Sequence, residues 1–280
     1  MTVDLFHKVS HECSRNVTIR YSTSFSSAIK LLHRDLRQPI FNIYGFVRFA
    51  DEIVDTFHDH DKQDLLQQFK RETFDAISRG ISLNPILNSF QQTVNDFKID
   101  LNLIHAFFSS MESDLTQNRY DRQGYEEYIY GSAEVVGLMC LYVFCEGNTT
   151  QYQSLKGPAQ ALGAAFQKVN FLRDIKADFV DLSRIYFPGC DFHNFTEGDK
   201  QQIQADIEAD FREAYKGILR LPIKAKFGVY VAYKYYYSLF KKIKRIEPRY
   251  ILQTRIRIPA YHKAYIVFRA GVKNRLNLLS

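Results

Sequence analysis

Tryptophan is absent from this chain of 280 residues, and there are only four cysteines and seven prolines. The cysteines lack the paired spacing of zinc-binding motifs, and reduced cysteines fit a reducing compartment. The longest uninterrupted apolar run, residues 135–145, is well short of the roughly 20 residues that span a membrane. The first ten residues also lack an apolar run, which argues against a secretory signal. These absences predict a cytoplasmic protein without a membrane-spanning segment.

The remaining composition is that of a globular protein. Hydrophobic residues make up 46% and charged residues 24% of the chain, which excludes a disordered or fibrous protein. The length would allow one large domain or two small ones. Because no domain linker, low-complexity tract or short repeat interrupts the sequence, we expect a single domain over residues 1–280.

Basic residues are concentrated toward the C-terminal end. Residues 220–280 contain 15 Lys and Arg and one acid, Glu247; this balance of +14 within a total of +6 leaves −8 for residues 1–219. The same segment holds eight of the 18 tyrosines. A basic, aromatic-rich segment suits a polyanion such as nucleic acid, anionic lipid or diphosphate. The alternative is a solvated helix face that only keeps the protein soluble.

The spacing of apolar residues is helical nearly throughout, and Asn-Gly or Asp-Gly hairpin signals are absent. The sequence therefore predicts an all-α fold. We expect the hydroxyl-rich residues 21–27 to form a loop or a frayed helix start, and residues 182–198 to form the longest loop. Helices are predicted at 3–20, 38–57, 61–79, 84–97, 100–117, 122–146, 150–180, 199–219, 222–246 and 250–277, with Pro39, Pro85, Pro158, Pro188 and Pro222 at plausible breaks.

A first polar stripe is predicted on the helix at 38–57. Tyr44, Arg48, Asp51 and Asp55 recur at intervals of three and four residues and therefore share one helix face. Large apolar residues surround them, and two carboxylates in such company need partners. These partners are either metal ions or, as the simpler alternative, Arg48 in a buried ion-pair network.

A second stripe is predicted on the helix at 150–180. Asn170, Asp174 and Asp178 recur every fourth residue, Gln167 lies one turn earlier, and Arg173 is adjacent. The simpler alternative here is a surface stripe whose carboxylates pair with a neighbouring Lys or Arg.

The two stripes together favour a magnesium site. Oxygen ligands without His or Cys suit a hard cation, and Mg²⁺ is typically held by one or two carboxylates together with substrate phosphates. Two carboxylate rows facing each other across a helical cavity would hold a small Mg²⁺ cluster on a diphosphate. Arg48 and Arg173 could pair with the remaining phosphate oxygens.

These residues resemble the squalene/phytoene synthase family, and most closely its bacterial phytoene synthases. The resemblance extends in order from about residue 15 to residue 190 and continues loosely through Tyr250, Arg255 and Arg257. The matching segments are Tyr21-Ser-Thr-Ser-Phe25, the Tyr44 to Asp55 stripe with Asp-Glu-Ile-Val-Asp, Tyr128-Ile-Tyr-Gly-Ser-Ala, Gln167-Lys-Val-Asn-Phe-Leu-Arg-Asp-Ile-Lys-Ala-Asp178 and Arg184-Ile-Tyr-Phe-Pro188.

The resemblance implies an isoprenoid synthase fold, a single helical domain around a deep central cavity. It implies the head-to-head condensation of two geranylgeranyl diphosphates to phytoene, through a cyclopropylcarbinyl diphosphate, as the first step of carotenoid synthesis. Mg²⁺, as two or three ions, would be the cofactor, and no NADPH is expected. The alternative within the family is synthesis of dehydrosqualene or squalene from the fifteen-carbon farnesyl diphosphate.

The resemblance also assigns roles to residues. Tyr44, Arg48, Asp51, Asp55, Asp174 and Asp178 would be catalytic, with Asp51, Asp55, Asn170, Asp174 and Asp178 as metal ligands. Substrate would contact Tyr21, Ser22, Thr23, Ser24, Phe25, Tyr44, Arg48, Tyr128, Gln167, Arg173 and Tyr250. Phe25, Tyr44, Tyr128, Phe166 and Tyr250 are candidates for an aromatic lining that shields a carbocation, with core packing as the alternative role. Glu134 stands where the family has a small or neutral residue, and it either narrows the cavity or points away.

Two further classes of function are weaker. A non-catalytic assembly factor of the same fold would have no need of the acidic pairs, which are all present here. A nucleic-acid binder would use the basic segment but would leave both acidic stripes unexplained. We therefore expect no nucleic-acid partner. The basic segment fits better as a peripheral contact with an anionic membrane surface, because the substrate and product are long hydrocarbons.

Overall fold

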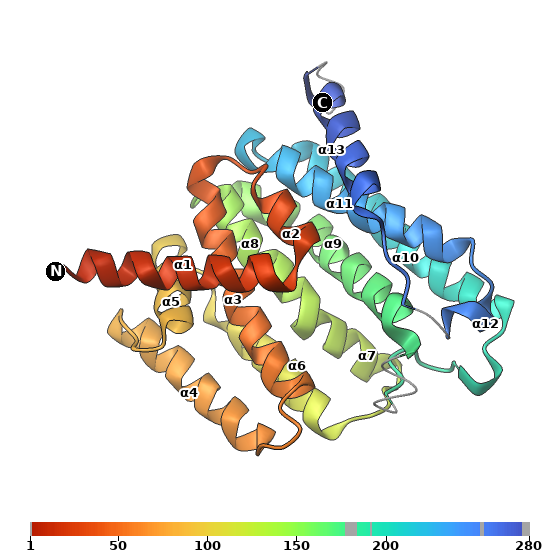
Figure 1. Ribbon diagram of the computed structural model, residues 1–280, viewed down its shortest axis with the longest axis horizontal. Coiled ribbons are helices and arrows are strands. Elements are labelled where there is room, and N and C mark those ends of the chain that lie inside the picture. The colour runs from red at the N-terminus through yellow and green to blue at the C-terminus, as the bar shows by residue number, and fades with distance from the viewer. Residues whose placement is uncertain (1, 177–183, 191, 253–254, 276–280) are drawn as a thin grey trace.

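The computed structural model describes residues 2–176, 184–190, 192–252 and 255–275, and nearly all of these residues lie in helices (Figure 1). The fold is all-α, as the sequence predicts; in the described residues the only strand-like pairing is an isolated bridge between Arg119 and Ile185. The α-helices are α1 (Val3–Tyr21), α2 (Thr23–Ile29), α3 (Arg34–Asp55), α4 (Lys62–Arg79), α5 (Pro85–Phe97), α6 (Leu101–Thr116), α7 (Arg122–Ile129), α8 (Val135–Cys145), α9 (Thr149–Ile175), α10 (Glu197–Arg220), α11 (Ile223–Lys244), α12 (Pro248–Ile251) and α13 (Ala260–Arg275).

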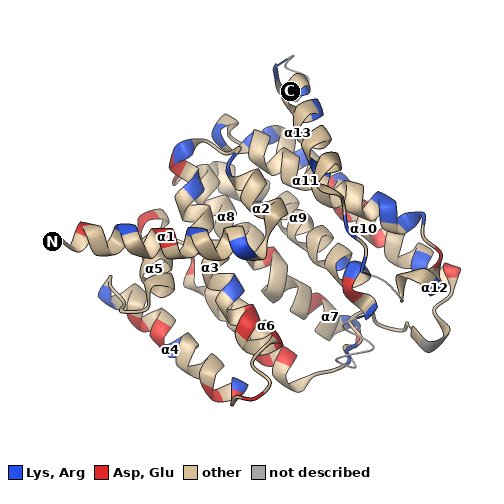
Figure 2. Cartoon of the chain, in the orientation of Figure 1, with Lys and Arg blue, Asp and Glu red and all other residues tan. Residues whose placement is uncertain are grey.

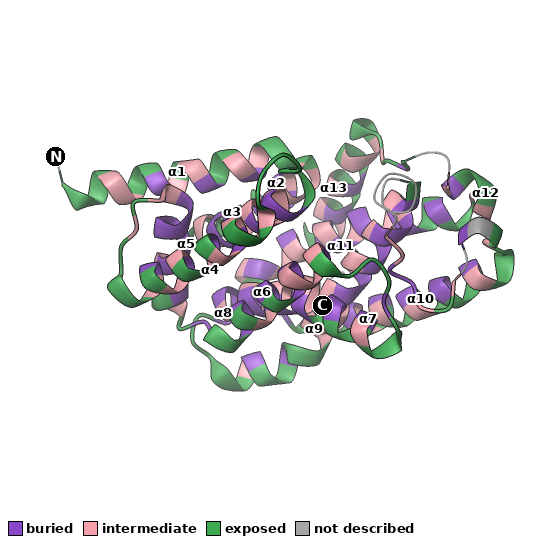
Figure 3. Cartoon of the chain, turned by 90° about the horizontal axis from the view of Figure 1, so that it is seen from below, coloured by how far each residue is buried: buried purple, intermediate pink, exposed green. Residues whose placement is uncertain are grey.

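The helices surround a central pair, α8 and α9. In Figure 1, α1, α3, α4 and α5 lie on one side of this pair, and α10, α11 and α13 lie on the other. Buried residues follow the inward faces of the helices, while the outer faces are exposed (Figure 3). A single hydrophobic core extends through both sides, so the described residues form one body.

Two prolines expected at helix breaks lie inside helices, Pro39 in α3 and Pro158 in α9. Proline has no N–H to donate to the carbonyl four residues earlier, which makes a helix interior costly. For Pro158 that carbonyl belongs to Ser154, and it accepts a hydrogen bond of 2.9 Å from Arg220 Nη2. A long-range donor thus replaces the missing bond, a compensation that local sequence does not reveal.

Other boundaries differ from the prediction for local reasons. Residues 23–29 form a regular helix because the Ser22 side chain accepts a hydrogen bond from the Phe25 amide and caps it. The helix expected at 250–277 is divided into α12 and α13, which are separated by non-helical residues that include Pro259. The helix expected at 150–180 is described as far as Ile175 within α9, and the rest of that range falls largely on residues 177–183, which are not described.

The stretch from Arg122 to Cys145 is continuously helical, but its hydrogen-bonding pattern changes from α to π between α7 and α8. Residues 130–134 form a π-helical turn, η1, a feature that often marks functional sites. Glycines let this region approach α9 closely: a Cβ on Gly163 would lie 2.6 Å from the Ala133 carbonyl oxygen. The η1 turn therefore packs backbone against backbone on α9.

By length and composition alone, Arg122–Cys145 is also the one stretch in the described residues that could cross a membrane. The uninterrupted apolar run within it covers only residues 135–145, so the length of apolar runs alone does not predict this stretch. More than half of its most apolar window is buried inside the protein, which is also true of ordinary core helices. Several of its residues line the central cavity described below.

Candidate active site

A cavity of about 680 Å³ lies between α2, α3, α6, α8, α9, α10 and α11. One end is polar, and the rest is lined mainly by apolar side chains such as Ile29, Val136, Leu162 and Ile218. Leu155 and Asp174, near opposite ends of α9, both line it. These two residues are 19 positions apart, and at a rise of about 1.5 Å per residue the cavity follows α9 for about 28 Å.

The predicted stripe on α3 faces this cavity. Tyr44, Arg48, Asp51 and Asp55 all line it. The Arg48 guanidinium forms an ion pair with Glu52, lies 3.8 Å from the Asp51 carboxylate, and stacks 4.5 Å from the centre of the Tyr21 ring. The simpler alternative of an ion-pair network with Arg48 is therefore present, but it leaves the carboxylates open to the cavity.

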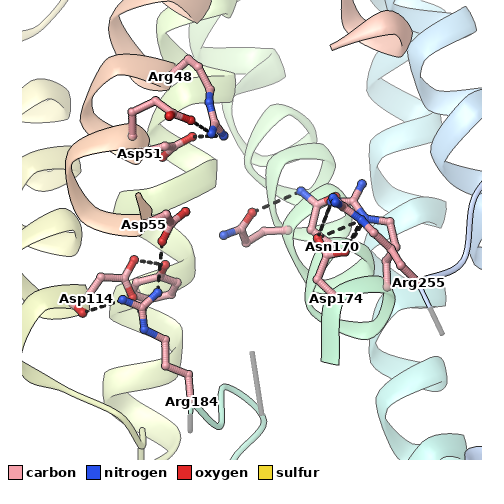
Figure 4. Close-up of polar contacts among 12 residues, drawn as sticks. Arg48, Asp51, Asp55, Asp114, Asn170, Asp174, Arg184 and Arg255 are labelled. Carbon is pink, nitrogen blue, oxygen red and sulfur yellow. Dashed lines mark hydrogen bonds and ion pairs between the residues drawn. The ribbon is translucent and has the colours of Figure 1, made fainter. Parts of the chain in front are cut away.

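The predicted stripe on α9 faces the same cavity from the opposite wall (Figure 4). Gln167, Asn170, Arg173 and Asp174 line it. The Asp174 carboxylate accepts hydrogen bonds from Arg173 Nε at 3.0 Å and from Arg173 Nη2 at 2.5 Å, and Arg255 Nε lies 2.8 Å away. Asp178, the last residue of the predicted stripe, lies outside the described residues.

A third set of polar contacts, centred on Arg184, connects Asp55 of α3 to Asp114 of α6. Arg184 Nη1 lies 3.1 Å from the Asp55 carboxylate, and its Nη2 donates a 3.0 Å hydrogen bond to the main-chain carbonyl of Asp114. The Asp114 side chain accepts a 2.5 Å hydrogen bond from the Tyr128 hydroxyl and longer ones from Tyr120 and Tyr186. Both Asp114 and Arg184 line the cavity.

The enclosed setting raises the pKa values of the acids. Burial, together with the neighbouring charge of Asp55, raises the pKa of the Asp51 carboxyl to about 7, although Arg48 acts in the opposite direction. Burial raises the pKa of Asp114 to about 6 despite the lowering effects of Arg184 and Tyr128. Strongly perturbed carboxyls in a cleft are typical of functional sites.

Charges of both signs lie together at the polar end of the cavity. Asp51, Asp55, Asp114 and Asp174 line it, and so do Arg48, Arg173, Arg184 and Arg255. Each arginine contacts one of these carboxylates or the neighbouring Glu52, or a main-chain oxygen beside them. The arginines at this end are therefore already paired with acids of the protein.

Aromatic rings form the walls next to the polar end. Phe166 and Tyr236 stack at 3.9 Å, and the ring of Phe25 lies within 6.0 Å of both of them and 5.7 Å from Tyr44. On the other side, Tyr128 belongs to a second group in which Phe171 and Tyr186 stack at 4.0 Å. All of these residues line the cavity.

Not every predicted contact residue reaches the cavity. Tyr21 and Ser22 line it, whereas Thr23 and Ser24 do not. Tyr250 does not line it either; its side chain is 47% exposed and stacks with Arg249. Glu134 is not among the lining residues and accepts a 2.9 Å hydrogen bond from Gln160. Of the two alternatives, it therefore points away and does not narrow the cavity.

Four residues that the fold brings to this end have no role predicted from the sequence: Asp114, Arg184, Tyr236 and Arg255. Asp114 could have been predicted from the sequence. It continues the apolar helix face of Phe107 and Met111, where a carboxylate without partners is costly. Tyr236 was noted only as part of a basic, tyrosine-rich segment. Arg184 and Arg255 come from irregular segments far along the chain, so helical spacing could not place them.

The donors at this end fit a hard cation with a partial set of protein ligands. Asn170 Oδ1 is buried and lacks a hydrogen-bond partner in the described structure, so a ligand oxygen is unused. In the part of the chain that the structure describes, no three His, Cys, Asp or Glu side chains are close enough to hold an ion by themselves. The carboxylate and amide oxygens that are present suit Mg²⁺, which typically takes one or two carboxylates and completes its shell with water and substrate phosphate.

Relatives with named activities match most of the chain. It is 27% identical to a phytoene synthase of Arthrospira platensis, over 95% of this chain and 94% of that protein. It is 26% identical to a presqualene diphosphate synthase of Rhodopseudomonas palustris, over 80% and 84%. It is also 24% identical to a 4,4'-diapophytoene synthase of Staphylococcus haemolyticus, over 68% and 66%.

Solved structures show the same fold at lower identity. A dehydrosqualene synthase in complex with a ligand superposes with a TM-score of 0.81, at 18% identity and covering 96% of this chain and 98% of that one. The squalene synthase HpnC from Alicyclobacillus acidocaldarius gives a TM-score of 0.75, at 21% identity over 88% and 96%. The fold is therefore the isoprenoid synthase fold that the family resemblance implies. The squalene/phytoene synthase family model matches residues 18–262, and the chain accordingly belongs to this family of prenyltransferase-type enzymes.

Proposed function

We propose that the protein condenses two molecules of geranylgeranyl diphosphate head to head, giving phytoene through a cyclopropylcarbinyl diphosphate. The observation that carries this proposal is the placement of Asp51 and Asp55 on α3 opposite Asn170 and Asp174 on α9, at the polar end of a long apolar cavity. Diphosphate groups would lie between the rows, and the prenyl chains would extend into the apolar part. Oligomeric state plays no part in this proposal.

The pairing of the arginines with acids explains why further cations would be needed. A diphosphate carries several negative charges, and the guanidinium groups there already contact carboxylates of the protein. Asp51 and Asp55 on one side, and Asn170 and Asp174 on the other, would hold Mg²⁺. When bound, Mg²⁺ supplies positive charge that stabilises the departing diphosphate. The carboxylates would then pair with metal, which leaves Arg48, Arg173, Arg184 and Arg255 free to donate to phosphate oxygens.

The chemistry begins with cleavage of the bond between the first prenyl carbon and its diphosphate oxygen, and diphosphate keeps the electron pair. The double bond of the second substrate attacks the allylic cation, and loss of a proton closes the cyclopropane ring. In the second half, the cyclopropylcarbinyl diphosphate loses its own diphosphate, rearranges and loses another proton to give the hydrocarbon. The arginines hold each departing diphosphate, which can accept these protons, and for this reason no protein base is assigned.

The aromatic walls suit the cationic intermediates. Phe25, Phe166 and Tyr236 on one side and Phe171 on the other lie directly beside the polar end. Their ring faces attract a cation and exclude water that would otherwise capture it. The Tyr44 hydroxyl stays protonated, because burial raises its pKa to about 12.

The length of the cavity supports the twenty-carbon substrate. The apolar lining continues along α9 to Leu155 and also includes Phe144 and Leu221. A path of about 28 Å along this helix accommodates an extended twenty-carbon chain. The phytoene synthase of Arthrospira platensis, which matches 95% of this chain, also supports this choice.

Farnesyl diphosphate is the second candidate substrate. Its support is the superposition on a dehydrosqualene synthase with a TM-score of 0.81, together with the relatives named for presqualene diphosphate and diapophytoene. A shorter chain would leave the apolar end near Leu155 unfilled. The product in this case would be dehydrosqualene, formed without NADPH.

The test is to incubate purified protein with Mg²⁺ and either geranylgeranyl or farnesyl diphosphate, and to identify the hydrocarbon by mass. We expect a forty-carbon product from the first substrate at a higher kcat/KM than any thirty-carbon product from the second. A preference for farnesyl diphosphate would overturn the choice of substrate but not the reaction class. Absence of any hydrocarbon from both substrates would overturn the proposed reaction.

A further inference from the structure

Helix α13 carries a stripe of large apolar side chains that face away from the protein. Tyr261, Tyr265, Phe268 and Val272 have exposed fractions of 77%, 56%, 71% and 44%. They are spaced four, three and four residues apart, so at about 100° per residue they fall within an arc of about 60° on one side of the helix. Exposed apolar residues usually occur singly, and a stripe of four needs an explanation.

The stripe is not the face that attaches α13 to the protein. Ile266 and Ala270 are 8% and 3% exposed, and α13 packs against α11 through that opposite face. The helix thus has one apolar side that meets the protein and a second that does not. Its C-terminal end extends past the other helices in Figure 1, which leaves the outward side accessible.

Basic residues flank the stripe. Arg269 and Arg275 are exposed on α13, and Lys273 lies on the same helix. Lys234 on α11 does not belong to this exposed group, because it is half-buried and lies over the rings of Tyr215, Tyr230, Tyr233 and Tyr237. Figure 2 shows the Lys and Arg residues along α11 and α13. Within the described residues none of these cations is in an ion pair, and the single acid after residue 220, Glu247, pairs with Arg249.

This surface begins beside the cavity. Lys263, in the first turn of α13, donates a 2.9 Å hydrogen bond to the Thr23 hydroxyl on α2. Two residues close to Thr23 in the sequence line the cavity: Phe25, which lies on α2, and Ser22, which immediately precedes α2. The segment that precedes α13 contributes Arg255, which contacts Asp174 at the polar end.

We propose that the α13 surface, defined as the stripe Tyr261, Tyr265, Phe268 and Val272 with the cations Arg269, Lys273 and Arg275, docks on an anionic lipid bilayer. A helix with aromatic and aliphatic residues on one side and Lys or Arg around them lies in the plane of the interface, where rings reach the acyl boundary and cations meet lipid phosphates. A purely electrostatic ligand such as nucleic acid would use the cations but not the apolar stripe.

Docking there would place the part of the cavity that is lined by Ser22, Phe25 and Arg255 near the bilayer. On the function proposed above, the substrates carry long prenyl chains and the product is a hydrocarbon without any polar group. Such a product leaves a protein far more readily into lipid than into water. Membrane binding itself does not depend on that function and can be tested separately.

The test is flotation of the full-length protein with vesicles of phosphatidylcholine, with and without an equal part of phosphatidylglycerol. At low salt we expect the protein to float with the anionic vesicles and to be released by high salt. The double substitution Tyr265→Ser with Phe268→Ser should weaken the apparent affinity at least tenfold. Its matched control is Leu83→Ser, which changes a 93% exposed side chain ahead of α5 and should have no effect.

The charge requirement is tested by Arg269→Gln with Arg275→Gln. This pair should remove most of the preference for anionic vesicles, whereas Arg34→Gln with Arg79→Gln, two exposed arginines elsewhere, should not. Both α13 variants should keep wild-type turnover of detergent-dispersed substrate, which shows that the fold is intact. The proposal is overturned if the wild type does not float at low salt, or if the stripe variant floats equally well. It is also overturned if the stripe instead forms a protein dimer, detected as a sedimentation change that the variant abolishes.

Discussion

Arg184 and Asp55, separated by 129 positions in the sequence, form an ion pair of 3.1 Å across the polar end of the cavity. The same guanidinium donates to the main-chain carbonyl of Asp114, so one side chain connects the ends of α3 and α6. An arginine in this place can serve both the carboxylate row and an incoming phosphate.

Replacing Arg184 by Gln should lower kcat/KM about 100-fold, which is the typical cost of removing one preorganised donor to a developing anion. Arg184→Lys keeps the charge but loses the paired geometry and should retain intermediate activity. Steady-state kinetics on both variants checks this, with circular dichroism as the control for folding. Wild-type kinetics for Arg184→Gln would contradict the role.

The aspartates that face each other should be required for turnover and not for folding. Asp51→Ala or Asp174→Ala should abolish hydrocarbon formation, because each removes a carboxylate that would hold Mg²⁺ against diphosphate. Helical content and the thermal midpoint should change little. Asp75→Ala on α4, whose side chain is 65% exposed, is the matched control and should be fully active. If the two active-site variants unfold, their aspartates mainly serve the ion-pair network.

Asp114 should make stability depend on pH. Its pKa in the folded protein, about 6, is above the ordinary 3.8, so between these values the folded state binds a proton that the unfolded state has lost. Stability contributed by this proton is present at low pH and declines as pH rises through this window, by about 3 kcal/mol in full. Urea unfolding at pH 4 to 7 should show wild type losing stability relative to Asp114→Asn. A pH-independent difference between the two proteins would refute this assignment.

The buried cation Lys168, where α9 packs on α10, should contribute to the stability of the fold and not to catalysis. Lys168 is 8% exposed and lies 2.7 Å from both Asp206 and Asp210 of α10. Lys168→Met leaves these carboxylates without their cation and should cost about 3 kcal/mol of the free energy of unfolding. Adding Asp210→Asn should restore part of that loss, as measured by a double-mutant cycle in urea. Additive losses would show that the pair is not coupled.

Sequence patterns predicted the rows on α3 and α9 because each row lies on one helix, where spacing alone determines the shared face. Asp51 and Asp55 on one side, and Asn170 and Asp174 on the other, therefore appeared before any tertiary information. That the two helices face each other was inferred from the oxygen ligands that a magnesium–diphosphate site needs. In the structure, Asp51, Asp55, Asn170 and Asp174 line one cavity.

The missed features depend on contacts between distant segments. Arg255 reaches Asp174 from a non-helical stretch, and Arg220 satisfies the carbonyl that Pro158 leaves free. Helix α2 depends on a cap from Ser22, a residue type that occurs equally in loops. Local propensity indicates which secondary structure each of these residues favours. It does not identify the other residue whose contact determines the structure that forms.

Helix α9 lines the cavity both at Asp174 and, about five turns away, at Leu155. On the proposed function, diphosphate would leave near Asp174 while the prenyl tail extends toward Leu155. Substitutions near Leu155 would therefore change the length of the product without touching the catalytic groups. This separation is one physical route by which a single scaffold gives rise to catalysts of different product size.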